Sequence, residues 1–325
     1  MKNEKTAIII VNWNGKKFLK NCLNAVFKQT YKNFDVYFVD NGSVDDSSKY
    51  VRENFLKVKI IQLDKNYGFA KGNNKGIEEA FKDKKVEYIV CLNNDTIVDK
   101  NWLKELIKTA EKNEKIGAVS SKAYFKDEKT IQNAGLIFSK SIQINKKGGI
   151  SLGYGLTDKE APELSNDIEI FAPSGVAPLY KRAVLEKLLL GDKEIFDEDF
   201  FAYSEDLDLG FRIKNLKYIS YLASNAKLVH LHSQTAGKES LFKVYYCERN
   251  VILTAIKNLP IYDLLLFSFR NIGLKISYLF NKNDSVEKLK KNIGFLGMFW
   301  ILIKANIAAL FLMPKMLVKR WRIKR

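Results

Sequence analysis

Short apolar runs separated by polar loops dominate the first 125 residues of the chain. Residues 6–11, 34–39, 58–63 and 88–92 have the length and apolar content of buried strands, and residues 116–120 predict a fifth. Between the first four runs, apolar residues recur at helical spacing, as at Phe18, Cys22 and Val26. Repeated strand–loop–helix units predict an α/β fold with a mainly parallel sheet flanked by helices.

The loops that follow these four strands are all rich in Asn, Asp and Gly. Parallel strands direct their carboxyl ends to one edge of the sheet, where ligands bind in open α/β folds. Ordinary turns use the same residue types, but four successive polar strand ends favour a ligand site. No G-x-G-x-x-G follows the first strand and no G-x-x-x-x-G-K-[ST] loop occurs, so a nucleotide would be held in another way. The loops are residues 12–15, 40–43, 66–70 and 93–96.

Two aspartates at these strand ends are candidates for nucleotide and metal binding. Asp40 can accept a hydrogen bond from the ring N–H of uracil or thymine, or it can form the turn. Asp45 or Asp46 can then cap the following helix. Asp95, in Asn93-Asn94-Asp95, can bind a divalent cation that bridges a diphosphate, although an Asx-rich turn is an equal alternative.

The second half contains an acidic and aromatic segment, residues 196–206, that ends in Glu205-Asp206. We predict a helix from about Leu207 with this pair in its first turn. Acidic residues there stabilise the helix dipole, whereas a catalytic role would make Asp206 a general base for an acceptor hydroxyl. The small residues of the loop 172–180 permit close approach of a substrate or close packing, and residues 181–190 predict a helix.

Residues 218–222 and 227–231 predict short strands, which place His230 or His232, the two histidines of the chain, at the end of an element. Their proximity makes a metal ligand as plausible as a structural role. The three cysteines show neither disulfide nor zinc spacing, which fits a reducing compartment. The first apolar run is too short for a secretory signal, so we expect the catalytic part in the cytosol.

Positive charge is concentrated at the C-terminal end. Residues 236–325 hold 17 Lys/Arg against 5 Asp/Glu, a net of +12 out of the +17 of the whole chain. Residues 293–313 are strongly apolar, and Pro314 and a basic end follow them. The run reaches the ~20 residues that span a bilayer. Lys304 makes a span costly, so we expect association with an anionic membrane surface; packing of these helices on the catalytic part or a partner subunit is the alternative.

Taken in order, these motifs resemble glycosyltransferase family 2, the inverting enzymes with a GT-A fold, in the branch of rhamnosyltransferase-like proteins of cell-surface polysaccharide synthesis. The resemblance covers about residues 5 to 260. It implies a GT-A catalytic domain at 1–260, with a nucleotide-sugar-binding half (1–125) and an acceptor half (126–260). A helical tail at 261–325 would hold it at the cytoplasmic face of the membrane. The matching stretches are residues 10–15, 39–47, 66–76, 92–96, 174–182, 196–209 and 230–235.

The resemblance also implies a role for each matching residue. Asp206 would be the catalytic base with Glu205 beside it, and Asp95 would bind Mg²⁺ or Mn²⁺ with His230, or alternatively His232, as a further ligand. Asn93 stands where the family often has the first Asp of an Asp-x-Asp motif, which should weaken metal binding without donor. The implied donor-binding residues are Asn12, Asn14, Asp40, Asn41, Asn66, Gly68, Phe69, Asn73, Asn94 and Asp95; the acceptor-binding residues are Ser174, Gly175, Tyr203 and Glu205.

The implied reaction is inverting transfer of a sugar from a nucleotide diphosphate-sugar, dTDP-rhamnose or a UDP-sugar, to a hydroxyl of a glycan or lipid-linked glycan. A catalytically inactive relative acting as a membrane-surface scaffold is one alternative. A nucleotidyltransferase is another, although the Gly-rich basic loop it needs is missing after the first strand. We expect no nucleic-acid partner, because the basic residues adjoin a long apolar run and no nucleic-acid motif is recognised. An oligomer is compatible with the sequence.

Overall fold

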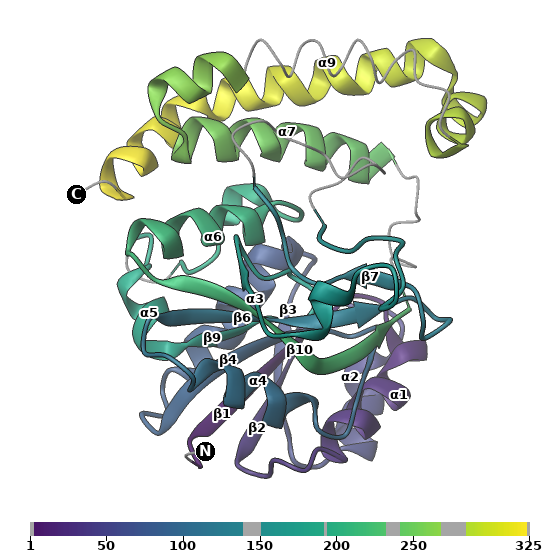
Figure 1. Ribbon diagram of the computed structural model, residues 1–325. Coiled ribbons are helices and arrows are strands. Elements are labelled where there is room, and N and C mark those ends of the chain that lie inside the picture. Colours follow the sequence, from purple (N-terminus) through teal and green to yellow (C-terminus); the bar gives the residue numbers. More distant parts are fainter. Residues whose placement is uncertain (1–2, 139–150, 192–193, 232–240, 268–283, 324–325) are drawn as a thin grey trace.

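The computed structural model describes residues 3–138, 151–191, 194–231, 241–267 and 284–323 (Figure 1). The first half alternates strands and helices as predicted. Its elements are β1 (Lys5–Asn12), α1 (Lys16–Phe27), β2 (Phe34–Asn41), α2 (Ser47–Asn54), β3 (Val58–Leu63), α3 (Gly68–Ala80), β4 (Val86–Asn93), β5 (Thr96–Val98), α4 (Trp102–Ala110) and β6 (Ile116–Tyr124).

The second half adds shorter strands and the longest helices. Its elements are β7 (Ile131–Asn133), η1 (Pro162–Ser165), β8 (Glu169–Ile170), β9 (Leu179–Lys181), α5 (Arg182–Lys187), η2 (Glu198–Phe200), α6 (Glu205–Asn215), β10 (Ile219–His230), α7 (Leu241–Asn258) and α9 (Asp284–Ile323).

A single mixed sheet runs through the α/β part in the order β3-β2-β1-β4-β9-β6-β10-β5. The four strands β3, β2, β1 and β4 are parallel, which confirms the predicted parallel sheet of the first half. The short strand β9 runs antiparallel between β4 and β6. In this register Asn12 lies beside Asp40 and Val11 beside Asn93, so the polar strand ends gather at one edge.

Helices cover both faces of the sheet because the side chains of each strand alternate between two cores. Ile8 and Ile10 of β1 face α1, α2 and α4, whereas Ala7 and Ile9 face α3, α5 and α6. All four side chains are fully buried. Burial on both faces explains why these strands are wholly apolar, since each Ile removed from water contributes about 1.5–3 kcal/mol.

Several predicted boundaries differ from the structure. Residues 218–222 and 227–231 were predicted as two strands, but they form the single strand β10, with a register shift between Leu222 and Lys227. Helix α3 begins at Gly68, inside the predicted loop 66–70. Helix α5 covers only Arg182–Lys187. The N-cap of α2 is Asp46, whose side chain makes no capping bond; Asp45 instead accepts from the backbone N–H of Ser47.

Helices α7 and α9 lie side by side across one end of the α/β part (Figure 1). A non-helical residue, Gly294 with φ +72°, interrupts α9, which then continues through Pro314 to Ile323. The apolar run predicted to end at Pro314 is therefore followed by further helix. One stripe of α9 is buried in this layer. Its residues are Met298, Leu302, Ala305, Ala309 and Met316.

Candidate active site

The polar ends of β1, β2 and β4 are joined by a chain of hydrogen bonds. Asn94 Nδ2 donates to Asn12 Oδ1 (2.6 Å), and Asn12 Nδ2 donates to Ser43 Oγ (3.1 Å). The backbone N–H of Ser43 donates to Asp40 Oδ1 (3.1 Å). Gly15 lies against this chain, since a Cβ on it would come within 2.4 Å of both Asn94 Nδ2 and Asn12 Oδ1. These residues, predicted from three of the four loops, do form one continuous polar edge.

The turn after β3 is fixed by a second group of amides. Asn41 Nδ2 donates to Asn66 Oδ1 (3.1 Å) and to the carbonyl oxygen of Gly68 (3.0 Å), and its Oδ1 accepts from the N–H of Tyr67. Asn66 Oδ1 also accepts from the N–H of Gly68 (2.8 Å). These contacts hold the first turn of α3 against the end of β2.

The remaining predicted donor residues have contacts within the protein. The side chain of Asp40 is buried and accepts from the Ser48 hydroxyl, as a turn-forming Asp would. Asn14 is exposed and accepts from the N–H of Val44 (2.8 Å). Asn73 is buried and donates to the carbonyl of Phe69 one helical turn earlier. The Phe69 ring packs edge-on against Phe196.

Asp95 and His230 meet at the edge of the sheet where β5 pairs with β10. His230 Nε2 lies 3.1 Å from Asp95 Oδ1, and the N–H of Leu231 donates to the Asp95 carbonyl (2.9 Å). On the other side of the imidazole, Nδ1 bonds to Oε1 of Gln132, which requires a proton on Nδ1. Nε2 is the ring nitrogen that faces Asp95. Sequence reasoning identified the histidine and missed Gln132. His232 lies outside the described residues.

This pair fits a divalent cation. A carboxylate oxygen and an imidazole nitrogen are both ligand types for divalent cations, and here they face each other 3.1 Å apart. Among the described residues no group of three or more His, Cys, Asp or Glu side chains could hold a metal. With Asp95 and His230 alone, the protein would supply two ligands to an ion here, and water or phosphate oxygens would supply the others.

Glu205 and Asp206 open helix α6, and Asp206 is tied to the strand-end edge by a short segment. The N–H of Gly175 donates to Asp206 Oδ2 (2.9 Å). The next residue, Val176, accepts at its carbonyl from the N–H of Asn93 (3.0 Å). A Cβ on Gly175 would come within 3.3 Å of Asp206 Oδ2. The acidic pair and the end of β4 thus lie on either side of one dipeptide.

The two carboxyl groups have different surroundings. Asp206 accepts two backbone N–H bonds, from Gly175 and from Leu207 (2.8 Å). Glu205 is buried, and its Oε2 has no hydrogen-bond partner. Burial, followed by the charge of Asp206, raises the pKa of Glu205 well above its usual range. Burial also raises the pKa of Asp206, although its two N–H bonds act in the opposite direction. The pair therefore favours a neutral Glu205 next to an ionised Asp206.

The loop that leads into this pair has an unusual backbone. Phe201, Tyr203 and Ser204 all have positive φ, between 63° and 70°. For residues with a side chain, each such conformation costs on the order of 1–2 kcal/mol. The carbonyl of Phe201 accepts from the N–H of Ala70 (3.2 Å), so the loop also rests on the first turn of α3. Strain of this kind persists only where the surroundings enforce it.

The surroundings that enforce it come from α7. Asn250 Nδ2 lies within 2.8 Å of the carbonyl oxygens of Phe200, Ala202 and Tyr203. The Arg249 guanidinium donates to the carbonyls of Asp199 (2.7 Å) and Phe200 (3.0 Å). Sequence reasoning missed both residues. The signal available to it was two adjacent polar residues before an apolar stretch, Val251-Ile252-Leu253.

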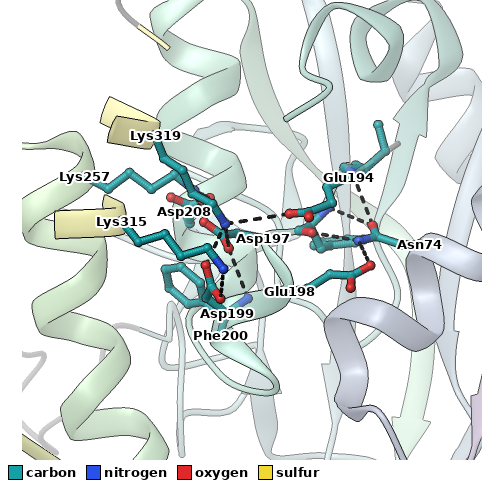
Figure 2. A network of polar contacts seen from close by, with 12 residues as sticks. Asn74, Glu194, Asp197, Glu198, Asp199, Phe200, Asp208, Lys257, Lys315 and Lys319 are labelled. Atoms are coloured by element: carbon teal, nitrogen blue, oxygen red, sulfur yellow. Dashed lines mark hydrogen bonds and ion pairs between the residues drawn. The ribbon is translucent and has the colours of Figure 1, made fainter. Parts of the chain in front are cut away.

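A buried ionic network joins the same segment to α7 and α9. Figure 2 shows Lys257 between Asp197 (2.7 Å) and Asp208 (2.9 Å), all three nearly inaccessible to water. Lys319 of α9 pairs with Asp197 and with Asp199 (2.8 Å). The last turns of α9 are therefore fixed to the segment just before the catalytic candidates.

The other predicted acceptor residues lie beside the acidic pair. Ser174 is buried, and its N–H donates to Ser120 Oγ (3.3 Å). The half-buried ring of Tyr203 packs edge-on near Phe242 at the start of α7. The structure thus brings Ser174, Gly175, Tyr203, Glu205 and Asp206 into one region.

Comparison with known proteins identifies a family. The family description "Glycosyl transferase family 2" matches residues 7–189. An O-antigen biosynthesis protein RfbC of Myxococcus xanthus is 26% identical over 252 residues, which is 74% of this chain and 18% of that protein. A poly-beta-1,6-N-acetyl-D-glucosamine synthase of Staphylococcus epidermidis is 26% identical over 60% of this chain and 44% of that protein. The chain therefore spans less than half the length of these two relatives.

Solved structures confirm the predicted GT-A fold. Staphylococcus aureus TarS 1-349 in complex with UDP aligns with a TM-score of 0.52 at 16% identity and covers 98% of this chain and 90% of that one. A mannosyltransferase from Pyrobaculum calidifontis, in complex with GDP-Man and Mn²⁺, aligns with a TM-score of 0.56 at 14% identity, covering 96% and 88%. At such identities the likeness concerns the fold alone.

Proposed function

Because the chain belongs to glycosyltransferase family 2, we propose that it is an inverting glycosyltransferase with Asp206 as its general base. The donor is a nucleotide diphosphate-sugar, dTDP-rhamnose or a UDP-sugar, and the acceptor is a hydroxyl of a glycan or lipid-linked glycan. One observation carries the proposal most directly. Gly175 donates its N–H to Asp206, and the next residue, Val176, accepts from the N–H of Asn93 at the end of β4, which supports a base close to the proposed donor edge.

The donor would lie along the polar edge of β1, β2 and β4. Asp40 would read the N–H of a uracil or thymine ring, with its existing bonds to Ser43 and Ser48 holding the carboxylate in place. Asp95 and His230 would hold Mg²⁺ or Mn²⁺. When bound, the ion neutralises charge on the leaving diphosphate. Asn12 and Asn94, joined to each other, would position the phosphates.

The acceptor would approach from the side of Asp206. Two backbone N–H bonds orient this carboxylate, and burial raises its pKa and makes it a stronger base. It would take the proton of the acceptor hydroxyl as that oxygen attacks the anomeric carbon opposite the diphosphate. Glu205, kept neutral by burial beside Asp206, can donate a hydrogen bond to the acceptor. A single displacement of this kind inverts the anomeric centre.

A donor screen tests the function. The full-length protein would be incubated with Mn²⁺ or Mg²⁺ and a panel of dTDP-, UDP- and GDP-sugars, and nucleotide binding, slow hydrolysis and the anomeric configuration of the product would be followed. We expect metal-dependent turnover of one donor, with inversion. This metal-dependent turnover should be lost in Asp95→Ala. Binding without turnover of any donor would indicate an inactive scaffold, and pyrophosphate release from nucleoside triphosphates would indicate a nucleotidyltransferase.

We also propose that α9 lies on the cytoplasmic membrane surface. Among the described residues, Leu296–Ile323 is the one helix long and apolar enough to cross a membrane. Its Lys319, however, is ion-paired to Asp197 of the α/β part, which supports an interfacial position over a span. Opposite its buried stripe, α9 exposes a second apolar stripe at helical spacing. Its residues are Leu296, Trp300, Ile307, Leu310, Phe311, Leu317, Val318 and Trp321.

A further inference from the structure

The loop before the acidic pair is held from outside the α/β part by one buried amide. Asn250 of α7 is fully buried, and its Nδ2 lies 2.8, 2.8 and 2.7 Å from the carbonyl oxygens of Phe200, Ala202 and Tyr203. An amide nitrogen has two protons, so two of these carbonyls are satisfied at a time and the third shares a donor. Three successive contacts of this kind define the path of the chain just before Glu205.

The orientation of this amide is fixed by its neighbour. Arg249 Nε donates to Asn250 Oδ1 (2.9 Å), so Nδ2 must face the loop. The same guanidinium reaches the carbonyls of Asp199 and Phe200. The aromatic faces of Tyr245 and Tyr246 lie against it, at 5.7 and 4.6 Å from Arg249 Cζ to the ring centroids. Arg249 and Asn250 therefore act as one rigid donor group directed at four carbonyls.

The contacts of Arg249 and Asn250 are made to the loop that contains the residues with positive φ. Phe201, Tyr203 and Ser204 have positive φ, and in an unsupported loop each would relax toward negative φ. Such a change would rotate the peptide groups that place Glu205 and Asp206 at the start of α6. The hydrogen bond from Gly175 to Asp206 Oδ2 would be altered with them.

We propose that Asn250, oriented by Arg249, is a positioning residue for transfer: it holds the strained 200–204 loop so that the Asp206 carboxylate faces the acceptor. The inference rests on the proposed function, because Asp206 must be the base for its position to matter. Asn250 bonds to backbone carbonyls of the loop, that of Tyr203 included, and its effect passes through the loop backbone. Substitution should therefore lower kcat and leave nucleotide affinity unchanged.

Asn250→Leu keeps the branched shape of the side chain and removes its donors. We expect kcat to fall roughly 10- to 100-fold, as for a small displacement of a catalytic group. UDP and dTDP, used as nucleotide probes in calorimetric titrations, should bind with wild-type affinity and stoichiometry. By hydrogen exchange, amides 198–207 should lose protection, whereas amides 38–44 at the end of β2 should keep theirs.

Asn258→Leu is the matched control. Asn258 is a buried asparagine of the same helix, but its Nδ2 donates to Asp208 Oδ1 (2.8 Å) and to the Thr254 carbonyl, not to the loop. The Asn258→Leu variant should have lower thermal stability, but its kcat should not fall and its amides 198–207 should not exchange faster. If Asn250→Leu does not fold, Arg249→Lys removes the bond to Asn250 Oδ1 at constant charge and should give the same pattern.

The outcomes separate the two proposals. Wild-type protein that turns over no nucleotide sugar contradicts the proposed function. Wild-type turnover with kcat unchanged in Asn250→Leu, or lowered equally in Asn258→Leu, contradicts only the positioning role. A fall in nucleotide affinity that matches the fall in kcat would also overturn it, because it would show a general loss of structure.

Discussion

The Nε2 atom of His230 and the Oδ1 atom of Asp95 lie 3.1 Å apart, although the two residues come from opposite halves of the chain. Antiparallel pairing of β5 with β10 brings them together, since Thr96 is the partner of His230 in the register. Gln132 lies in β7, which pairs with β6, and its Oε1 contacts Nδ1 of the imidazole. Gln132 and His230 from the second half of the chain therefore gather around Asp95 from the first half.

Substitution of Gln132 should weaken metal use without removing a ligand. In Gln132→Leu the imidazole loses the contact that orients its ring, so Nε2 is held less firmly toward Asp95. Loss of such a partner typically costs 10- to 100-fold in metal affinity, and we expect the Mn²⁺ concentration for half-maximal activity to rise by about that factor. Gln29→Leu is the control, because Gln29 is another buried amide but binds Leu103, Asp99 and Ala25. An equal shift in both variants would count against the metal site.

The acidic pair should respond unequally to neutral substitutions. Asp206→Asn removes the base and should reduce transfer by about 10³-fold, within the usual range for general-base catalysis, while UDP or dTDP binding persists. Glu205→Gln should retain most of its activity at neutral pH, because burial already keeps this carboxyl group protonated. Steady-state kinetics of both variants with one donor decides the matter. Retained turnover in Asp206→Asn would refute its role as the base.

Glu205 also makes a prediction for stability against pH. Its pKa is raised in the folded protein, so the folded state binds more protons than the unfolded state between the usual Glu value and the raised one. The free energy of unfolding should therefore fall as pH rises through that interval. Glu205→Gln should remove this slope and be more stable than wild type at pH 8, with little difference at pH 4. Denaturant titrations at both values would show it, and parallel pH profiles would contradict a protonated Glu205.

Much of the donor edge could be predicted from the sequence, because periodicity and turn residues are local. Asn12, Asp40 and Asn94 each end an apolar run, and parallel strands necessarily bring such ends together. Asn250 could not be found this way, since its partners are backbone carbonyls almost 50 positions away and carry no sequence signal. The same holds for Lys319, which reads as part of a basic tail and is in fact buried against Asp197.

The buried network predicts different effects for two lysines of α9. The Lys319 side chain is 11% exposed and pairs with the fully buried Asp197, whereas that of Lys315 is 57% exposed and pairs with Asp199. Burial alone would raise the pKa of Asp197, but Lys257 and Lys319 hold it well below its usual range. Lys319→Met leaves that carboxylate with Lys257 as its one lysine partner in the network and should cost about 3 kcal/mol in unfolding free energy. Lys315→Met should cost less than about 1 kcal/mol. Equal losses of unfolding free energy would mean that the buried Lys319–Asp197 pair stabilises the protein no more than the exposed Lys315–Asp199 pair.

The exposed stripe of α9 predicts how the protein meets a membrane. Phe311 is 82% exposed on a helix whose opposite side is already packed, and an apolar side chain in this position contributes when it enters the headgroup region. Phe311→Glu should reduce cosedimentation with vesicles of anionic phospholipid by about tenfold, through lost burial and added repulsion.

Leu56→Glu introduces the same charge at a residue that is 89% exposed between α2 and β3, outside the helical layer. It should bind vesicles like the wild type, which separates a local effect of the stripe from a change in net charge. Both variants should unfold at the wild-type temperature, because neither side chain is packed. If Phe311→Glu sediments with vesicles as well as Leu56→Glu does, the stripe is not the membrane contact, and a partner protein becomes the better explanation for its exposure.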